Sequence, residues 1–130
     1  MQKIINQNLI SYKTVLRTYN ETISDNKEVL VRQKEIIITD VKTTQKNIFL
    51  PDEIDGCPIS DIGDSAFENN DSIEHVTLPK QLKNIRKNAF KNCKNLSDIV
   101  IPEKAARIGD YAFENCKSLK NVIIPASVTD

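Results

Sequence analysis

The sequence has no tryptophan, three glycines and a single histidine, His75. Aromatic residues make up only 5% of its 130 residues. A zinc site or a catalytic triad needs several converging side chains, usually with a histidine among them, and a phosphate-binding loop needs clustered glycines. We therefore predict no enzyme, no catalytic residue, no cofactor and no metal site.

An excess of one charge and long apolar runs are also lacking. Lys and Arg number 18, as do Asp and Glu, so the whole chain has no electrostatic preference for nucleic acid or an anionic membrane. No stretch approaches the roughly 18 apolar residues of a spanning helix. The opening MQKIINQNLISYK carries Asn and Gln where a signal peptide needs an unbroken apolar stretch. We predict no nucleic-acid partner, no membrane insertion and no visible signal peptide, which leaves the cytoplasm open as a location.

The sequence does contain a phrase that recurs at a fixed interval, as IGDSAFENN, IRKNAFKNC and IGDYAFENC. Between these phrases the apolar positions are kept while the other positions vary. The recurring columns are Ile62, Ile85 and Ile108; Ala66, Ala89 and Ala112; Phe67, Phe90 and Phe113; Ile73, Leu96 and Leu119; Val76, Ile99 and Val122; Leu78, Ile101 and Ile124; and Pro79, Pro102 and Pro125. Such a constant period indicates a stack of similar units.

Each unit predicts one coil of a solenoid. The alternating apolar residues before each proline are typical of a short strand with alternate side chains inside, and the proline ends that strand. The Ala-Phe pair in polar surroundings favours one helical turn. Because one unit cannot bury its apolar face alone, units must stack with strands about 4.8 Å apart. We predict an α/β solenoid, a short horseshoe segment with parallel strands on the concave side and short helical turns on the convex side.

These motifs resemble the BspA-like leucine-rich repeats, also called the Treponema pallidum type. The resemblance covers about Ile48 to Val128, with an irregular first unit: the segment from Pro51 to Ile62 is longer than the equivalent segment from Pro79 to Ile85. It implies a secreted or surface-associated adhesin that binds host or neighbouring-cell proteins without catalysis. An intracellular scaffold and a structural spacer of a longer array are the alternatives.

The first 47 residues do not match the repeat and are predicted to form an N-terminal cap. One amphipathic helix face is indicated by the 4-3-4-3 spacing of Ile5, Leu9, Tyr12, Leu16 and Tyr19. The β-branched stretch EVLVRQKEIIITDV favours two short strands. The alternative is a helix that binds a partner. Residues 48–130 form the repeat domain.

We expect no C-terminal cap in the repeat domain, because the sequence reaches only Asp130, where the next turn would begin. We therefore expect a chain truncated from a longer array, or self-association through the open C-terminal end.

Stacking also predicts ladders along the columns. Asp64, Lys87 and Asp110 share one column, and Glu68, Lys91 and Glu114 another, so opposite charges alternate. Asn69, Asn92 and Asn115 are expected to form a hydrogen-bonded ladder. The basic run from Lys80 to Lys94 could instead bind nucleic acid. Aromatic residues do not alternate with its basic residues, however, as they would in a surface that stacks on bases. Cys93 and Cys116 are expected to be buried fillers, since an odd cysteine count disfavours a disulfide scaffold.

The outward positions of the strands are the predicted binding site. Exposed apolar columns with polar neighbours often mark interaction surfaces, whereas the alternative is that β-branched residues simply favour strands. The predicted concave site comprises Phe49, His75, Thr77, Asp98, Val100, Asn121 and Ile123. Its expected partner is a protein or a glycoprotein.

Overall fold

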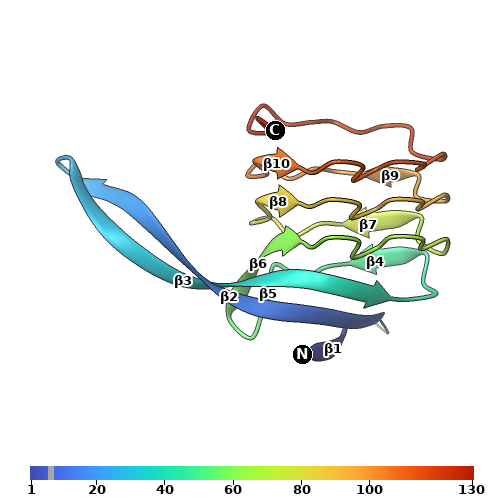
Figure 1. Cartoon of the computed structure of the whole chain (residues 1–130), viewed down its shortest axis with the longest axis horizontal. Coiled ribbons are helices and arrows are strands. Elements are labelled where there is room, and N and C mark those ends of the chain that lie inside the picture. Colours follow the sequence, from blue (N-terminus) through green and yellow to red (C-terminus); the bar gives the residue numbers. More distant parts are fainter. Residues whose placement is uncertain (6–7) are drawn as a thin grey trace.

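The computed structural model describes residues 1–5 and 8–130, and these residues form strands and turns but no helix. Two parts are visible: a stack of similar coils, and a long two-stranded ribbon that projects from the first coil (Figure 1). The bounds of the strands are β1 Gln2–Ile5, β2 Asn8–Ser24, β3 Lys27–Lys42, β4 Asn47–Phe49, β5 Glu53–Ile54, β6 Cys57–Ile62, β7 His75–Thr77, β8 Asn84–Ile85, β9 Asp98–Ile99 and β10 Arg107–Ile108.

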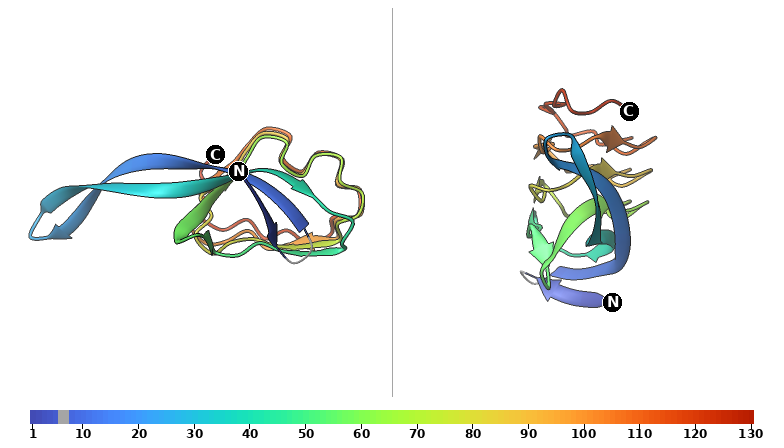
Figure 2. Two further views of the ribbon diagram at one scale, coloured as in Figure 1. Left: turned by 90° about the horizontal axis from the view of Figure 1, so that it is seen from below. Right: turned by 90° about the vertical axis from the view of Figure 1, so that its left-hand side faces the viewer.

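The strands form two sheets. The larger one has the order β1-β2-β3-β6-β8-β10, with β5 paired to β6, and the smaller has the order β4-β7-β9. The views in Figure 2 show that the coils superimpose along the stack and that the ribbon leaves them sideways. The N-terminal strands β1, β2 and β3 thus join the coils through the larger sheet, in which β3 pairs with β6.

The predicted N-terminal amphipathic helix is wrong, because Tyr12 and Tyr19 both lie in β2. Ile10 and Tyr12 are buried on one face of this strand, which is the two-residue period of a sheet. The turn from β2 to β3 contains Asp25 and Asn26 with φ of 47° and 61°. Consecutive left-handed residues of this kind match the twist of a hairpin. The turn at Asp25 and Asn26 and the pairing with the β-branched strand β3 therefore favour a strand here, although the spacing of the apolar residues fits a helix.

The stretch predicted as two short strands is the single strand β3. It pairs antiparallel with β2 over most of its length and parallel with β6 at Ile36–Ile38. β3 thereby covers the side of β6 that faces away from β8. Residues 6 and 7 of the predicted cap lie outside the described residues.

The solenoid of parallel strands is confirmed by the pairing registers. His75 pairs with Asp98, and Asp98 bridges to Asn121, so each step along the sheet is one period of the repeat. Asn47 pairs with His75 across the longer first unit, which is therefore accommodated without a change of register. The extra residues form the β5–β6 hairpin, whose turn contains Gly56 at φ 79°.

The turns on the opposite side of the coils are not helical, contrary to prediction. Successive N–H groups donate alternately within the turn and to the next coil: Ala66 donates to Gly63 O at 3.2 Å, and Phe67 donates to Ala89 O at 2.7 Å. An α-helix would use both groups internally. Left-handed residues such as Asn69, at φ 66°, allow this alternation. The coils are therefore linked by main-chain hydrogen bonds on this side too.

The core runs along the stack between these two sides. Phe67, Phe90 and Phe113 stack in a column, with ring centroids 4.7 Å and 5.3 Å apart. Phe90 is fully buried between its two neighbours. Ile124, in the last coil, is 52% exposed although its equivalents Leu78 and Ile101 are buried. The recurring columns therefore form the core in the inner coils and lose cover at the last one.

Candidate functional site

The candidate site is the outer surface of the sheet β4-β7-β9 together with Val100 and residues 121–123, here called the strand face. Along each strand, alternate side chains point into the core and outward: Val76 is buried, whereas His75 and Thr77 are exposed. The parallel register stacks the outward residues, with Phe49 opposite Thr77. All seven residues predicted for the binding site therefore lie on one surface.

The apolar members of this surface are well exposed to solvent. Phe49 is 54%, Val100 77% and Ile123 79% exposed. These fractions are high for large apolar side chains, and burying such a side chain contributes roughly 1.5–3 kcal/mol. The face thus carries apolar area that a partner could cover.

A hollow of about 600 Å³ lies on the strand face. Six of the seven predicted residues line it, and Phe49 lies outside it. Lys80 and Pro102, which are not among the residues predicted for the site from the sequence, also line this hollow, and they lie shortly after the ends of β7 and β9. Beside it, a second hollow of about 500 Å³ is lined by Val100, Ile123 and Pro125 among others. Together the two hollows extend the apolar surface toward the last coil.

The strand face has one contact between polar side chains that joins neighbouring strands. His75 Nδ1 lies 2.6 Å from Asp98 Oδ1, and both side chains are at least half exposed. An exposed pair of this kind contributes little to stability. Across the described residues, no group of three or more His, Cys, Asp or Glu side chains is arranged to hold a metal ion. His75 and Asp98 therefore place polar groups beside the apolar column.

The ladders on the opposite side of the coils are only partly formed. Asn92 donates to Asn69 at 2.8 Å, and Asn115 donates to Asn92 at 2.9 Å, so the predicted asparagine ladder is confirmed. Among the ion pairs of the described residues, none links neighbouring residues within either of the two predicted charge columns. Lys91 lies instead above the Tyr111 ring, 5.8 Å from its centroid. The alternating charges are neighbours without direct contact.

The stacked cysteines are free thiols. Cys93 Sγ lies 3.1 Å from Phe67 O, and Cys116 Sγ lies 3.0 Å from Phe90 O. Burial, with a smaller contribution from Cys116, raises the pKa of the Cys93 thiol to about 12. A thiol held protonated in this way is a poor nucleophile, so it serves as core filling.

A second polar site, which the sequence did not reveal, lies where the ribbon meets the coils. This ion cluster comprises Arg17, Glu35, Asp61, Lys83 and Arg86. Asp61 is fully buried and accepts from Arg86 Nε at 2.7 Å, while Arg17 Nη2 lies 3.1 Å from its other oxygen. Glu35 accepts from Lys83 Nζ at 3.0 Å. The cluster ties both strands of the ribbon to β6 and to the residues on either side of β8.

The two acids of the ion cluster are held ionised. Burial alone would raise the pKa of Asp61, but hydrogen bonds from Ser60 and Arg86 hold that pKa below its ordinary value. Burial opposes ionisation of Glu35 as well, and hydrogen bonds from Tyr19 and Lys83 lower its pKa. Lys83 also lies over the Tyr19 ring, 4.0 Å from the centroid. All charged groups in this cluster are paired, as in a structural joint.

The constant period, the stacked phenylalanines and the asparagine ladder together characterise the coil. A family model described as the BspA type leucine rich repeat region matches residues 40–130 in six copies. The chain belongs to this family. Among curated proteins, none matches the sequence significantly. Repeats of this family are typically parts of non-enzymatic interaction modules that bind proteins.

Two solved structures show the same architecture. The leucine-rich repeat protein of T. pallidum is 29% identical with a TM-score of 0.71, over 85% of this chain and 49% of that one. A leucine-rich repeat protein from Bacteroides ovatus is 19% identical with a TM-score of 0.67, over 85% of this chain and 29% of that one. The chain therefore spans about half the length of the first and less of the second. In the part of the chain that the structure describes, no helix is long and apolar enough to cross a membrane.

Proposed function

We propose that this BspA-type repeat protein is an adhesin-type module that binds a host or neighbouring-cell protein through its strand face. The observation that carries the proposal is the exposed apolar column of Phe49, Val100 and Ile123, beside the polar groups of His75 and Asp98. Interfaces typically combine a central apolar patch with a polar rim. Proteins of this family are commonly surface-associated, which supports a partner outside the cell.

Two features favour a macromolecular partner over a small molecule. The hollow on the strand face is formed by β7, β9 and their continuation, and the apolar column continues beyond it to Phe49 and toward Pro125. A small-molecule pocket would bury most of its ligand, whereas this column runs across successive coils. A glycoprotein could use the same face, with its protein part on the apolar column and its sugars on the polar rim.

The test is binding of the purified chain to a panel of extracellular-matrix and cell-surface proteins. The variant Phe49→Ser/Val100→Ser/Ile123→Ser removes the apolar column and is expected to lose binding by at least about tenfold, since central apolar contacts dominate interfaces. A matched control, Leu16→Ser/Ile23→Ser/Tyr111→Ser, removes three similarly exposed apolar side chains elsewhere and should bind normally. Equal loss in both variants would contradict the proposal.

Absence of binding by the native chain on the whole panel would contradict the adhesin function. The search for partners should then move to intracellular proteins, because an intracellular scaffold would use the same face. If those also fail, a structural spacer is the remaining function.

Self-association through the C-terminal end stays a prediction. The last coil leaves Ile124 52% exposed, and Phe113 is only partly covered because a ring, that of Phe90, stacks on only one of its two faces in the described structure. Apolar area of this kind would be buried by a second end or by another coil.

A further inference from the structure

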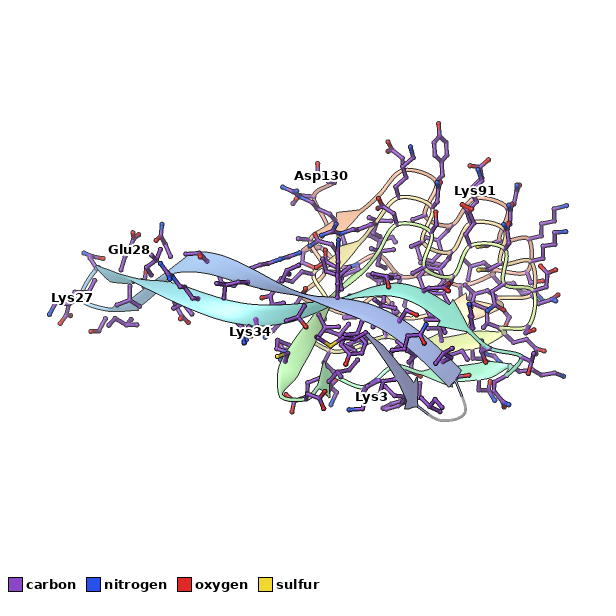
Figure 3. The ribbon with its side chains drawn as sticks, turned by 60° about the horizontal axis from the view of Figure 1, so that its bottom comes forward. Lys3, Lys27, Glu28, Lys34, Lys91 and Asp130 are labelled. Carbon is purple, nitrogen blue, oxygen red and sulfur yellow. The ribbon has the colours of Figure 1, made fainter. Side chains whose placement is uncertain are left out.

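The outer part of the β2–β3 ribbon, residues 15–34, is here called the arm. Figure 3 shows Lys27 and Glu28 near its free end and Lys34 closer to the coils. Its two strands pair with each other, but their outer edges are open over the described residues: β6 reaches β3 only at Ile36–Ile38, and β1 pairs with β2 only at Asn8–Ser11. A two-stranded ribbon without further cover is marginally stable in water.

Along the open edge of β3, the even-numbered residues direct their main-chain N–H and C=O groups away from β2. Ile38 O accepts from Gly63 N–H at 2.7 Å, and Ile36 O lies 3.4 Å from Ser60 Oγ, so both carbonyls face away from β2. The register between β2 and β3 is regular from Glu28 to Ile38. Main-chain groups alternate along a strand, so those of Leu30 and Arg32 also point outward.

The side chains along this edge are self-complementary. The local sequence Glu28-Val29-Leu30-Val31-Arg32 has an acid at one end, a base at the other and three apolar residues between them. An antiparallel copy centred on Leu30 places Leu30 opposite Leu30, Val29 opposite Val31, and Glu28 opposite Arg32. Leu30 is 63% exposed in the single chain, so this pairing would cover it.

We propose that two copies of this chain pair antiparallel through the outer edges of β3, centred on Leu30, and join their arms into one four-stranded sheet. A shift by one residue is excluded, because it would place the outward-pointing main-chain groups of one copy opposite residues of the other copy whose main-chain groups point toward β2. The register centred on Leu30 also keeps the second copy's turn short of Ile36, where β6 occupies the edge. This proposal is independent of binding at the strand face.

The edge of β2 is the less suitable side of the arm. Arg17, the base that could pair across such an interface, already contacts Asp61 at 3.1 Å and lies near Glu35. The second copy would have to break these contacts or leave its own acid unpaired. Charge complementarity therefore favours the β3 edge.

The first test is light scattering and sedimentation of the whole chain over a wide concentration range. We expect a monomer–dimer equilibrium that Leu30→Pro abolishes, because proline removes an outward N–H donor that β2 does not use. Asn20→Pro is the matched control: Asn20 lies directly opposite Leu30, on the β2 edge, and this variant should still dimerise.

The second test exchanges the charges and is insensitive to a folding defect. Glu28→Arg and Arg32→Glu each place like charges opposite one another twice in the dimer, so each should weaken association by about tenfold. The double variant restores opposite charges and should regain native affinity. A chain that stays monomeric at every concentration overturns the proposal. So does association that survives Leu30→Pro, and its loss in Ile124→Ser would then assign the contact to the C-terminal end.

Discussion

Phe90→Ala should lower the free energy of unfolding by about 3–5 kcal/mol, the usual cost of removing a fully buried aromatic side chain. Phe90 stacks between Phe67 and Phe113, so its removal opens a cavity in the middle of the stack that two neighbouring coils would have to close. Denaturant unfolding of the native and variant chains, followed by circular dichroism, measures the effect.

Lys91→Ala is the control for the same turn. Lys91 is partly exposed and makes only a distant contact with the Tyr111 ring, so its loss should cost well under about 1 kcal/mol. Equal and small effects at both positions would show that the phenylalanine column does not hold the coils together.

Arg86→Met should destabilise the chain by about 3 kcal/mol, because it leaves the buried carboxylate of Asp61 short of one of its two cationic partners. Arg17 and Ser60 still contact Asp61 in this variant, so the loss of unfolding free energy should lie at the low end of the range for breaking a buried ion pair. Arg107→Met is the matched control, since its partner Asp130 is 3.5 Å away and both side chains are about 70% exposed. That variant should change stability by less than about 0.5 kcal/mol.

The ion cluster also predicts how stability depends on pH. The folded pKa values of Asp61 and Glu35 lie below their ordinary values of 3.8 and 4.5. Groups with a lowered folded pKa stabilise above the ordinary pKa, and this stabilisation is lost as the pH falls through the folded one. Stability should therefore hold at neutral pH and fall below about pH 4.5. In Arg86→Met the pKa of Asp61 rises, so the contribution of Asp61 should be lost at higher pH than in the native chain; identical pH profiles would contradict this role.

The repeat made the coils predictable from sequence alone. Columns such as Ile62, Ile85 and Ile108 specify which side chains stack, and the pairing of Asp61 with Asn84 and of Asn84 with Arg107 follows at the same spacing. The side opposite the strands was not predictable in the same way. An Ala-Phe pair fits one helical turn locally, and only the neighbouring coil makes the alternate hydrogen bonds more favourable.

The ribbon shows why the N-terminal prediction failed. The spacing of Tyr12, Leu16 and Tyr19 fits a helix face, but Asp25-Asn26 between two β-branched stretches was a hairpin signal. The ion cluster had no comparable signal, because Arg17 and Glu35 lie outside the repeat and meet Asp61 only through the fold. Residues on the strand face, by contrast, follow from the alternation within each repeat.

Hydrogen–deuterium exchange of the chain, free and saturated with the first panel protein that binds, tests the central claim most directly. If the strand face is the binding surface, amides of β7, β9 and residues 121–123 gain protection, while those of the turns at 64–70 and 87–93 are unchanged. Protection confined to those turns, or to the arm, would contradict binding through the strand face.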